Sequence, residues 1–545
     1  MKELREVTNP PSSPITSDRP SSPYTAARRK IANQLAIDPY AYSADGRVFT
    51  YETPLAQSIP AGEFVEIRTD RHIYLGQVLD AEIVEREGPE FTLQGDAGLN
   101  VSIESVQVTQ TSVRMRFRNV VGHGNLLARM HGEEALETGG ADTFDDAAIS
   151  RAQVSTVASY IASHSGTGTQ LPIGHLAGFA DNAPVASLRA KGFGRHSFLV
   201  GQSGSGKTYS LGVMLERILA ETDLRIVIID PNSDYVRLGD LRSQIDPSLQ
   251  SGTERYRRAA SEIRVMRPRD RTTAPGDVLK LRFSDLSPRV QGLVLQIDPI
   301  ADREEYEAYW SIVRQMGLKH FSLRDLQDAA GKNLSAGSRQ IALRIANLGV
   351  SDWGIWAENG EPSIADVGDD WRCLVFDIGG LEHAEEKSLV ANGLLGWLWH
   401  KKDERIPTLI VIDEAHNICP QEPDDPIQAM ATRRAISIAA EGRKYGLYLL
   451  LSTQRPSKIH INVLSQCDNL ILMRMNSSED IRTLAEVFSF VPRPLLDRST
   501  TFVQGETLVA GQITPVPLLA HFGHRYSQEG GSDVPSTWTQ PQVRT

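Results

Sequence analysis

GQSGSGKT, residues 201–208, is the stretch that determines the fold of this chain. It matches the pattern G-x-x-x-x-G-K-[ST], in which glycines let several backbone N–H groups turn toward one phosphate group. The apolar run HSFLV before it predicts a buried strand. The helix predicted after it has an apolar stripe formed by Leu211, Met214, Leu215, Ile218 and Leu219. A strand, a glycine turn and a helix in this order predict a phosphate-binding loop, to which the helix N-terminus adds a positive dipole.

The residue types in this loop predict ATP and Mg²⁺ as cofactors. Lys207 is expected to reach the β- and γ-phosphates, and the Thr208 hydroxyl is expected to bind Mg²⁺. The predicted nucleotide-binding residues are Gly201, Gln202, Ser203, Gly204, Ser205, Gly206, Lys207, Thr208 and Tyr209.

TLIVIDEAH, residues 408–416, is an apolar strand that ends in two adjacent carboxylates. We expect Asp413 to hold the Mg²⁺ shell, and Glu414 to orient the attacking water or accept its proton. The alternative is a buried strand that ends at a solvated loop, which would show the same sequence pattern. The phosphate loop in the same α/β segment favours the functional interpretation.

LLLSTQRP, residues 449–456, is a second buried strand with a polar end. The amide of Gln454 can both donate and accept, so we expect it to contact the γ-phosphate and the attacking water. The alternative is a polar turn before Pro456.

EGRKYGL, residues 441–447, closes a helix predicted to begin at about Asp425. Arg443 is our candidate for an arginine finger that serves the phosphate loop of a neighbouring subunit, with Lys444 as the runner-up. An arginine that interacts with the helix dipole gives the same pattern, and residue chemistry alone leaves both readings open.

Strand and helix patterns divide the chain into six parts. We expect an unstructured or docking tail at 1–44, with a short helix around 26–36, and a small β-barrel at 45–125. The ATPase core is expected at 126–239, after a linker, and at 366–526, with a helical insertion at 240–365 and a polar tail at 527–545. Continuously apolar strands indicate a mostly parallel sheet, so the predicted fold class is α/β with a RecA-like P-loop core.

Composition limits the classes of function. The net charge of −11 excludes a protein coated with basic surface, so contacts with DNA would be confined to a channel. Three cysteines far apart indicate free thiols in a reducing cytoplasm. The N-terminus has no apolar run, and the apolar stretch at 389–400 is too short to span a bilayer, so we expect a buried helix there and no membrane anchor.

Together these segments resemble the HerA family of the FtsK–HerA branch of P-loop ATPases. The similar features are GQSGSGKT, IIDPNSDY with Asp230 and Asp234, LIVIDEAHNICP, and EGRKYGLYLLLSTQRPSKIHINVLSQCDNLILMRM. The resemblance covers about residues 45–525. It implies a hexameric ring around double-stranded DNA and assigns Lys207, Thr208, Asp413, Glu414, Gln454 and Arg443 the roles given above. It also implies a partner effector, such as a nuclease or a sirtuin-like enzyme, with defence against phage as one setting. The long Pro/Ser-rich N-terminal tail departs from the family.

We therefore expect a DNA translocase or helicase driven by ATP hydrolysis. Arg339 and Arg344 in the helical insertion are possible DNA contacts, although such residues more often form a solvated helix face. One alternative is an ATP-gated ring scaffold that positions a partner enzyme. A weaker alternative is a motor for protein transfer or conjugative DNA transfer.

Overall fold

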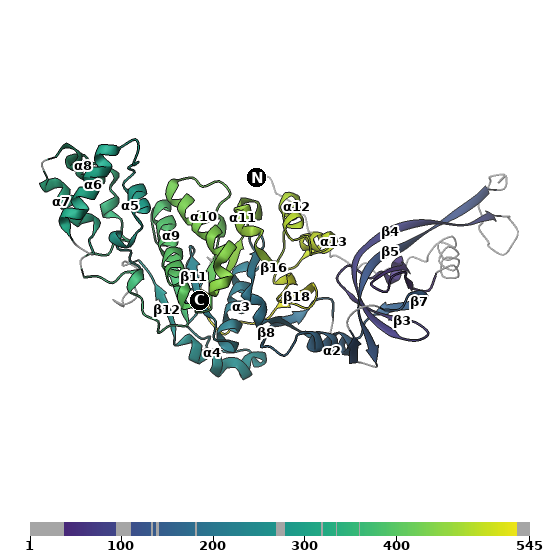
Figure 1. Ribbon diagram of the computed structural model, residues 1–545. Helices are drawn as coiled ribbons and strands as arrows, with labels where there is room; N and C mark the ends of the chain where they lie inside the picture. Colours follow the sequence, from purple (N-terminus) through teal and green to yellow (C-terminus); the bar gives the residue numbers. More distant parts are fainter. Residues whose placement is uncertain are drawn as a thin grey trace, which may run out of the picture. The chain divides into compact units, whose positions relative to one another are not determined.

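The computed structural model describes residues 37–530, apart from 94–110, 132–133, 138–140, 180–182, 269–277, 318–319, 334 and 359. The chain forms two compact units (Figure 1). The first comprises 1–60, 65–127 and 139–151, and the second comprises 61–64, 128–138 and 152–545. Most of the predicted N-terminal tail, including its helix at 26–36, and the C-terminal residues after 530 lie outside the described residues.

A sheet of antiparallel strands forms most of the first unit, and its strand β6 (Glu134–Glu137) falls within the second unit's range of 128–138. The strands are β1 (Tyr40–Ser43), β2 (Val48–Pro54), β3 (Phe64–Arg68), β4 (Ile73–Leu93), β5 (Thr111–His131), β6 (Glu134–Glu137) and β7 (Phe144–Arg151). Their order is β2-β1-β7-β3-β4-β5-β6, and pairing of β2 with β5 closes the barrel. The predicted range 45–125 therefore begins after β1 and stops before β6 and β7.

Small residues hid the later barrel strands from sequence reasoning. Residues 121–170 are rich in Gly, Ala and Ser, which suggested linkers and a helix. Gly122 and Gly124 lie instead within β5, where a Cβ atom would stand 2.6 Å from the Tyr51 ring and 2.2 Å from the Phe49 ring, respectively. These glycines let β5 pack closely over two aromatic rings inside the barrel.

An eleven-stranded sheet forms the core of the second unit. Its strands are β8 (Gln170–Leu176), β9 (Val185–Arg189), β10 (His196–Val200), β11 (Arg225–Asp230), β12 (Ile263–Met266), β13 (Cys373–Asp377), β14 (Thr408–Ile412), β15 (Leu447–Thr453), β16 (Cys467–Leu472), β17 (Glu506–Gly511) and β18 (Leu518–Phe522). The order is β12-β13-β11-β14-β15-β10-β16-β17-β18-β8-β9. The pairings from β12 to β16 are parallel and those from β16 to β9 are antiparallel. The predicted fold class, a mostly parallel α/β core with a β-barrel and a helical insertion, is confirmed.

Helices pack against this sheet (Figure 1). They are α2 (Val154–His164), α3 (Lys207–Glu221), α4 (Thr253–Ala260), α9 (Ala384–His400), α10 (Pro426–Glu441), α11 (Ile461–Leu464), α12 (Ser478–Val487) and α13 (Arg493–Asp497). The predicted start of a helix near Asp425 is confirmed, because the Asp425 carboxylate caps α10 by accepting the N–H groups of Ile427 and Gln428.

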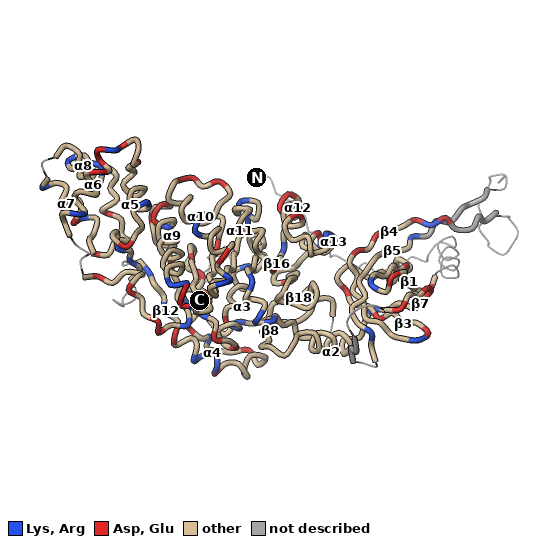
Figure 2. Tube along the Cα trace, in the orientation of Figure 1, with Lys and Arg blue, Asp and Glu red and all other residues tan. Residues whose placement is uncertain are grey.

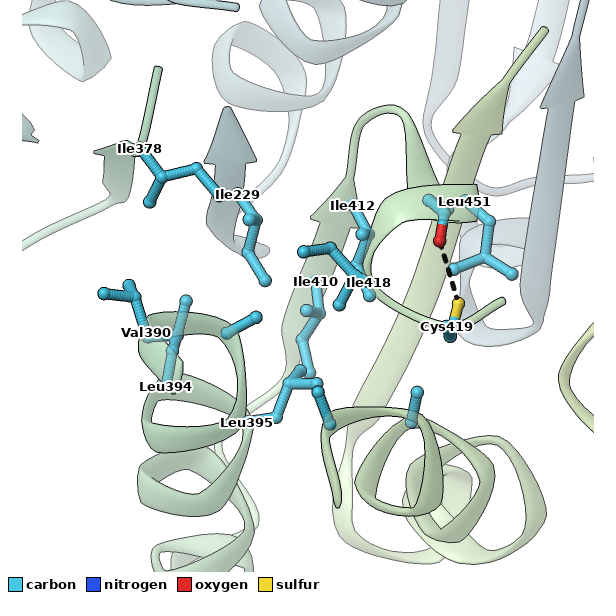
Figure 3. Packing of buried hydrophobic residues seen from close by; sticks show 14 of the residues in the cluster. Ile229, Ile378, Val390, Leu394, Leu395, Ile410, Ile412, Ile418, Cys419 and Leu451 are labelled. Carbon is cyan, nitrogen blue, oxygen red and sulfur yellow. Dashed lines mark hydrogen bonds between the residues drawn. The ribbon is translucent and has the colours of Figure 1, made fainter. Parts of the chain in front are cut away.

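The core lies between the parallel strands and the helices α9 and α10. In Figure 3, Ile410 of β14 extends toward Leu395 of α9, and Ile229 and Ile378 lie on the side of Val390 and Leu394 of the same helix. The apolar stretch at 389–400 is therefore a helix packed on the sheet, as predicted. Among the described residues, no helix combines the length and the apolar character that crossing a bilayer requires.

The helical insertion is shorter than the predicted 240–365. Its main helices are α5 (Pro288–Val294), α6 (Arg303–Met316), α7 (Leu323–Lys332) and α8 (Ala336–Leu348). β12 falls inside the predicted range but pairs with β13 at the sheet edge, because this four-residue strand gave too short a signal. Arg344 binds Glu305 at 2.6 Å across two helices, whereas Arg339 is exposed.

The segment predicted as a polar tail from residue 527 begins as ordered structure. Ser527 is fully buried, and its backbone N–H donates to Glu216 of α3 at 3.1 Å. Arg525 donates to the same carboxylate at 2.9 Å. This segment covers a face of α3 that the apolar stripe alone does not identify, which explains how a glutamate on that helix is buried.

Candidate nucleotide-binding and hydrolysis site

The loop at 201–208 joins β10 to α3, as its sequence predicts. Gly204 and Gly206 have φ angles of +74° and +92°, which L-residues with side chains rarely adopt. A Cβ atom at Gly206 would also stand 3.3 Å from the backbone nitrogen of Gly505. The backbone conformation thus favours glycine at Gly206, and the close approach of Gly505 leaves little space for a Cβ atom.

The phosphate loop is supported by hydrogen bonds with residues that follow β16 and residues that precede β17. The Gln202 N–H donates to the Arg474 carbonyl at 3.0 Å, and the Gly505 N–H donates to the Ser205 carbonyl at 3.0 Å. Arg474 also donates from Nη2 to the Gly204 carbonyl at 3.3 Å, while its buried Nε has no hydrogen-bond partner within the described part of the chain. Sequence reasoning missed Arg474. The polar residues that follow the apolar strand in NLILMRMN were the available signal.

Lys207 lies at the centre of the charged cluster. Its Nζ is 2.9 Å from Asp413 Oδ1, 3.0 Å from Glu414 Oε1 and 3.1 Å from Ser452 Oγ. These partners follow or end the neighbouring strands β14 and β15, whose carboxyl ends meet beside the phosphate loop. Burial alone would lower the pKa of Lys207, but the two carboxylates raise it above its ordinary value. The ammonium group therefore stays charged.

Two carboxylate oxygens of the cluster remain available to a metal ion. Asp413 Oδ2 and Glu414 Oε2 are buried and accept no hydrogen bond from the described residues. Buried carboxylate oxygens are costly to leave without a partner, and they are the ligands that Mg²⁺ prefers. Thr208 stands in the first turn of α3, directly after Lys207. The residues present thus fit a magnesium ion held by Asp413 and Thr208.

Glu414 has an unusual backbone conformation that aims its side chain. Its φ and ψ angles of 43° and 50° lie in the left-handed region, which costs about 1–3 kcal/mol for a residue of this type. Its Oε1 accepts a hydrogen bond from Gln454 Nε2 at 3.0 Å. The structure therefore brings together the two residues that we expected to handle the attacking water, and their catalytic roles stay predictions.

His416, two residues after Glu414, connects this polar cluster to the end of β15. Its Nδ1 lies 3.0 Å from Thr453 Oγ1 and 3.4 Å from Glu414 Oε2. Burial lowers the pKa of His416, and the negative charge of Glu414 only partly opposes that shift. The imidazole is therefore neutral near neutral pH and can bridge the ends of the two strands.

Asp230, at the end of β11, shapes a turn beside the site. Its carboxylate accepts the N–H groups of Asn232, Asp234 and Tyr235 at 3.2, 3.0 and 2.8 Å. Burial raises the pKa of Asp230 to about 7 although these hydrogen bonds oppose the shift. Asp230 organises the loop that carries Asp234, which is half-buried and electrostatically coupled to Asp413 and Lys207.

Two of the predicted site residues lie apart from this cluster. Arg443, in the short helix η11 (Gly442–Tyr445), precedes β15 and so lies at the amino edge of the sheet, opposite the phosphate loop. It is exposed and binds Asp468 at 2.8 Å. Tyr209 is half-buried on α3, and the guanidinium groups of Arg242 and Arg525 lie 6.0 and 5.9 Å from its ring centre.

Comparison with known proteins shows which proteins this chain resembles. The model of the helicase HerA central domain matches residues 171–344, which include the phosphate loop and α3. The DNA double-strand break repair helicase HerA of Sulfurisphaera tokodaii is 21% identical over 373 residues, which cover 64% of this chain and 68% of that protein. The HerA helicase of Pyrococcus furiosus is 32% identical over 114 residues, covering 21% of this chain and 20% of that protein.

Solved structures give a more distant likeness. VirB4 of Thermoanaerobacter pseudethanolicus has 16% sequence identity and a TM-score of 0.44, and the match covers 66% of this chain and 97% of that chain. The family match and the curated relatives agree with the resemblance found in the motifs. The chain therefore contains a HerA-type central domain at 171–344 and is similar to the HerA helicases over a larger part of its length.

Proposed function

We propose that this protein hydrolyses ATP with Mg²⁺ and uses the energy to move along double-stranded DNA. The observation that carries the proposal is the convergence of Lys207, Asp413, Glu414 and Gln454 within hydrogen-bonding distance at the end of the phosphate loop. These are the groups that phosphoryl transfer to water requires. The curated relatives are named as DNA repair helicases, which supports DNA as the track.

Each residue has a separate task in this reaction. The loop N–H groups and Lys207 bind the phosphates, and Lys207 exchanges its carboxylate partners for phosphate oxygens. Thr208 and Asp413 would hold Mg²⁺, which would supply positive charge to the phosphate groups when bound. Glu414 orients a water for attack on the γ-phosphorus and accepts its proton, while the bond to the bridging oxygen breaks. Gln454 holds Glu414 and senses whether the γ-phosphate is present.

The protein works as a ring in this proposal, with six copies as the expected number. Arg443 lies at the sheet edge opposite its own phosphate loop, so it can complete only the site of a neighbour. A guanidinium group supplied across an interface neutralises the charge that develops on the transferring phosphoryl group. The three cysteines are free and buried, which agrees with a cytoplasmic setting.

A partner enzyme, such as a nuclease or a sirtuin-like effector, would bind the barrel. Exposed apolar side chains on this unit support that assignment, with Tyr42, Val48 and Ile83 at 43%, 44% and 62% exposure. Serine substitutions at all three positions are expected to abolish co-purification with such an enzyme and to leave ATP turnover unchanged. Retained co-purification would place the partner elsewhere.

Displacement of a third strand from triplex DNA tests the motor directly. A translocase on the duplex strips the third strand in an ATP-dependent reaction, and Glu414→Gln is expected to stop it. ATP turnover without displacement, and indifferent to DNA, would contradict the proposal and favour the ATP-gated scaffold.

A further inference from the structure

The loops that follow β14 and β15, the strands that precede Glu414 and Gln454, are hydrogen-bonded to each other. We name residues 416–421, which follow Glu414, and residues 455–461, which follow Gln454, the paired loops. The Gln421 N–H donates to the Lys458 carbonyl at 2.7 Å, and the His460 N–H donates to the Cys419 carbonyl at 3.0 Å. The Ile461 N–H donates to the Gln421 side chain at 2.9 Å. The two segments therefore form one hydrogen-bonded unit.

Buried side chains fix this unit to the sheet from below. Ile418, Cys419 and Ile459 are each at most 2% exposed. Figure 3 shows Ile418 next to Ile412, and Cys419 next to Leu451. A unit that is bonded across and anchored below is expected to shift as one body rather than fray residue by residue.

The same unit is connected directly to the hydrolysis site. Gln454, the residue before the second loop, donates to Glu414 at 3.0 Å. His416, in the first loop, lies 3.0 Å from Thr453 Oγ1 at the end of β15. Glu414 and Gln454 lie within one or two residues of the paired loops along the chain. A change in their contacts during hydrolysis would therefore be transmitted to both loops.

The outer surface of the paired loops carries two cations that form no ion pair with the described residues, and the acidic residues Glu422, Asp424 and Asp425 follow the first loop along the chain. Arg455 and Lys458 are exposed, and neither side chain has an ion pair or hydrogen bond with the described residues. Basic residues lie beside α11 in Figure 2. Some other exposed arginines of the second compact unit are paired, such as Arg237 with Asp240 at 3.0 Å and Arg443 with Asp468 at 2.8 Å, whereas Arg339 and Arg482 are exposed without an ion pair among the described residues. Unpaired cations on a rigid surface are suited to bind a polyanion.

We propose that the paired loops are the surface that grips the phosphate backbone of DNA, through Arg455 and Lys458. The contact reads no bases, because cations that meet phosphates position a protein without sequence information. DNA bound at this surface and nucleotide bound at Glu414 and Gln454 would both change the position of the paired loops. Binding of DNA therefore affects binding of nucleotide, and the reverse. This inference rests on the proposed DNA motor and deepens it by naming the contact.

The test uses the full-length protein and a random-sequence DNA duplex. The double variant Arg455→Ala/Lys458→Ala is expected to keep basal ATP turnover within about twofold of wild type, since the one hydrogen bond from Arg455 to the site is made by its backbone N–H, to Thr453, and is kept in the variant. Its affinity for the duplex should fall by about tenfold or more, with a shallower salt dependence and no stimulation of turnover by DNA. Affinity is measured by fluorescence anisotropy over a salt series.

Three comparisons make the test decisive. Lys332→Ala/Arg339→Ala removes two exposed cations from the helical insertion and should bind DNA like wild type. Glu422→Gln, beside the first loop, should bind at least as tightly as wild type. Arg455→Lys/Lys458→Arg keeps the charge and should keep stimulation, so loss of stimulation in this variant too would give the loops a structural role and overturn the proposal.

Two failures are distinguishable. Wild type that neither binds the duplex nor responds to it would overturn the DNA motor itself. Wild type that responds to DNA, together with a double variant of Arg455 and Lys458 that behaves like wild type, would overturn only the paired loops as the contact. If only the control variant Lys332→Ala/Arg339→Ala lost the stimulation of ATP turnover by DNA, the DNA contact would lie on the helical insertion instead.

Discussion

Gln454 donates a hydrogen bond from Nε2 to Oε1 of Glu414 at 3.0 Å, and Lys207 Nζ lies 3.0 Å from that same oxygen. One carboxylate oxygen therefore joins the phosphate loop, the end of β14 and the end of β15. Each element contributes a single residue to this contact, so its consequences can be tested residue by residue.

Glu414→Gln is expected to leave nucleotide binding within about threefold of wild type and to lower hydrolysis by about 100-fold or more, because the amide cannot accept the proton of the attacking water. Gln454→Ala should lower hydrolysis less, since it removes a positioning contact only. Binding of a fluorescent ATP analogue and phosphate release measure the two effects. Equal loss of binding and hydrolysis in Glu414→Gln would mean that Glu414 has another role.

Lys207→Ala is expected to abolish hydrolysis by removing the cation that contacts the phosphates. It also leaves two buried carboxylates without their shared partner, which costs about 3–5 kcal/mol. Thermal denaturation should therefore show a lower midpoint than for Lys191→Ala, a variant at an exposed lysine outside the site. A variant that folds with unchanged stability and still binds ATP would contradict this account of the cluster.

Arg443→Ala subunits alone should form rings with little hydrolysis, and so should Glu414→Gln subunits alone. Mixed rings are expected to recover turnover, because an intact Arg443 of one subunit can face an intact Glu414 of the next. Phosphate release across a series of mixing ratios measures the recovery. No recovery at any ratio would assign Arg443 to its contact with Asp468 within the chain.

Arg474→Ala is expected to weaken nucleotide binding by about tenfold, because the hydrogen bond from its guanidinium to the Gly204 carbonyl supports the phosphate loop. Arg482→Ala, at an exposed arginine of α12, is the matched control and should bind like wild type. Isothermal titration with a non-hydrolysable ATP analogue compares the variants. Equal affinities for Arg474→Ala and wild type would leave the loop supported by its backbone contacts alone.

His196 predicts a dependence of stability on pH. Its Nδ1 accepts the Leu449 N–H at 2.9 Å and its Nε2 lies 3.0 Å from the Ala439 carbonyl, so the buried ring is neutral. Burial lowers its pKa from 6.5 to about 4. The unfolded chain therefore binds a proton before the folded chain does. The stability contributed by the neutral ring is complete above pH 6.5 and is lost as the pH falls toward 4.

The lowered pKa of His196, from 6.5 to about 4, corresponds to a loss on the order of 3 kcal/mol across this window. Urea denaturation at a series of pH values measures it. The difference in unfolding free energy between wild type and His196→Gln should shrink as the pH falls, whereas His400→Gln, at an exposed histidine, should show a constant difference. A constant difference for His196→Gln as well would show that this ring does not set the pH dependence.

Local sequence patterns were sufficient for the centre of the site. A buried strand, a glycine turn and an amphipathic helix place Lys207, and an apolar strand that ends in Asp413 and Glu414 places the carboxylates. Both patterns depend on neighbouring residues only, so a single sequence reveals them. Gln454 was expected beside the γ-phosphate and the attacking water, and its hydrogen bond to Glu414 is shown by the structure only.

The remaining features depend on contacts between distant residues. The hydrogen bond from Arg474 to Gly204 joins residues 270 positions apart, and β16 carries no motif that marks it. Glu216 is buried on α3 because Arg525 and its neighbours return to cover it. The left-handed backbone of Glu414 is stabilised by its surroundings, since glutamate has no preference for it. Local residue patterns carry no signal for such contacts.

The most direct test of this account is ATP turnover by wild type and Glu414→Gln, measured with Mg²⁺ in the presence and absence of double-stranded DNA. We predict turnover in wild type that rises when DNA is added, and turnover close to background in Glu414→Gln under both conditions. Turnover in Glu414→Gln equal to that of wild type would contradict the account.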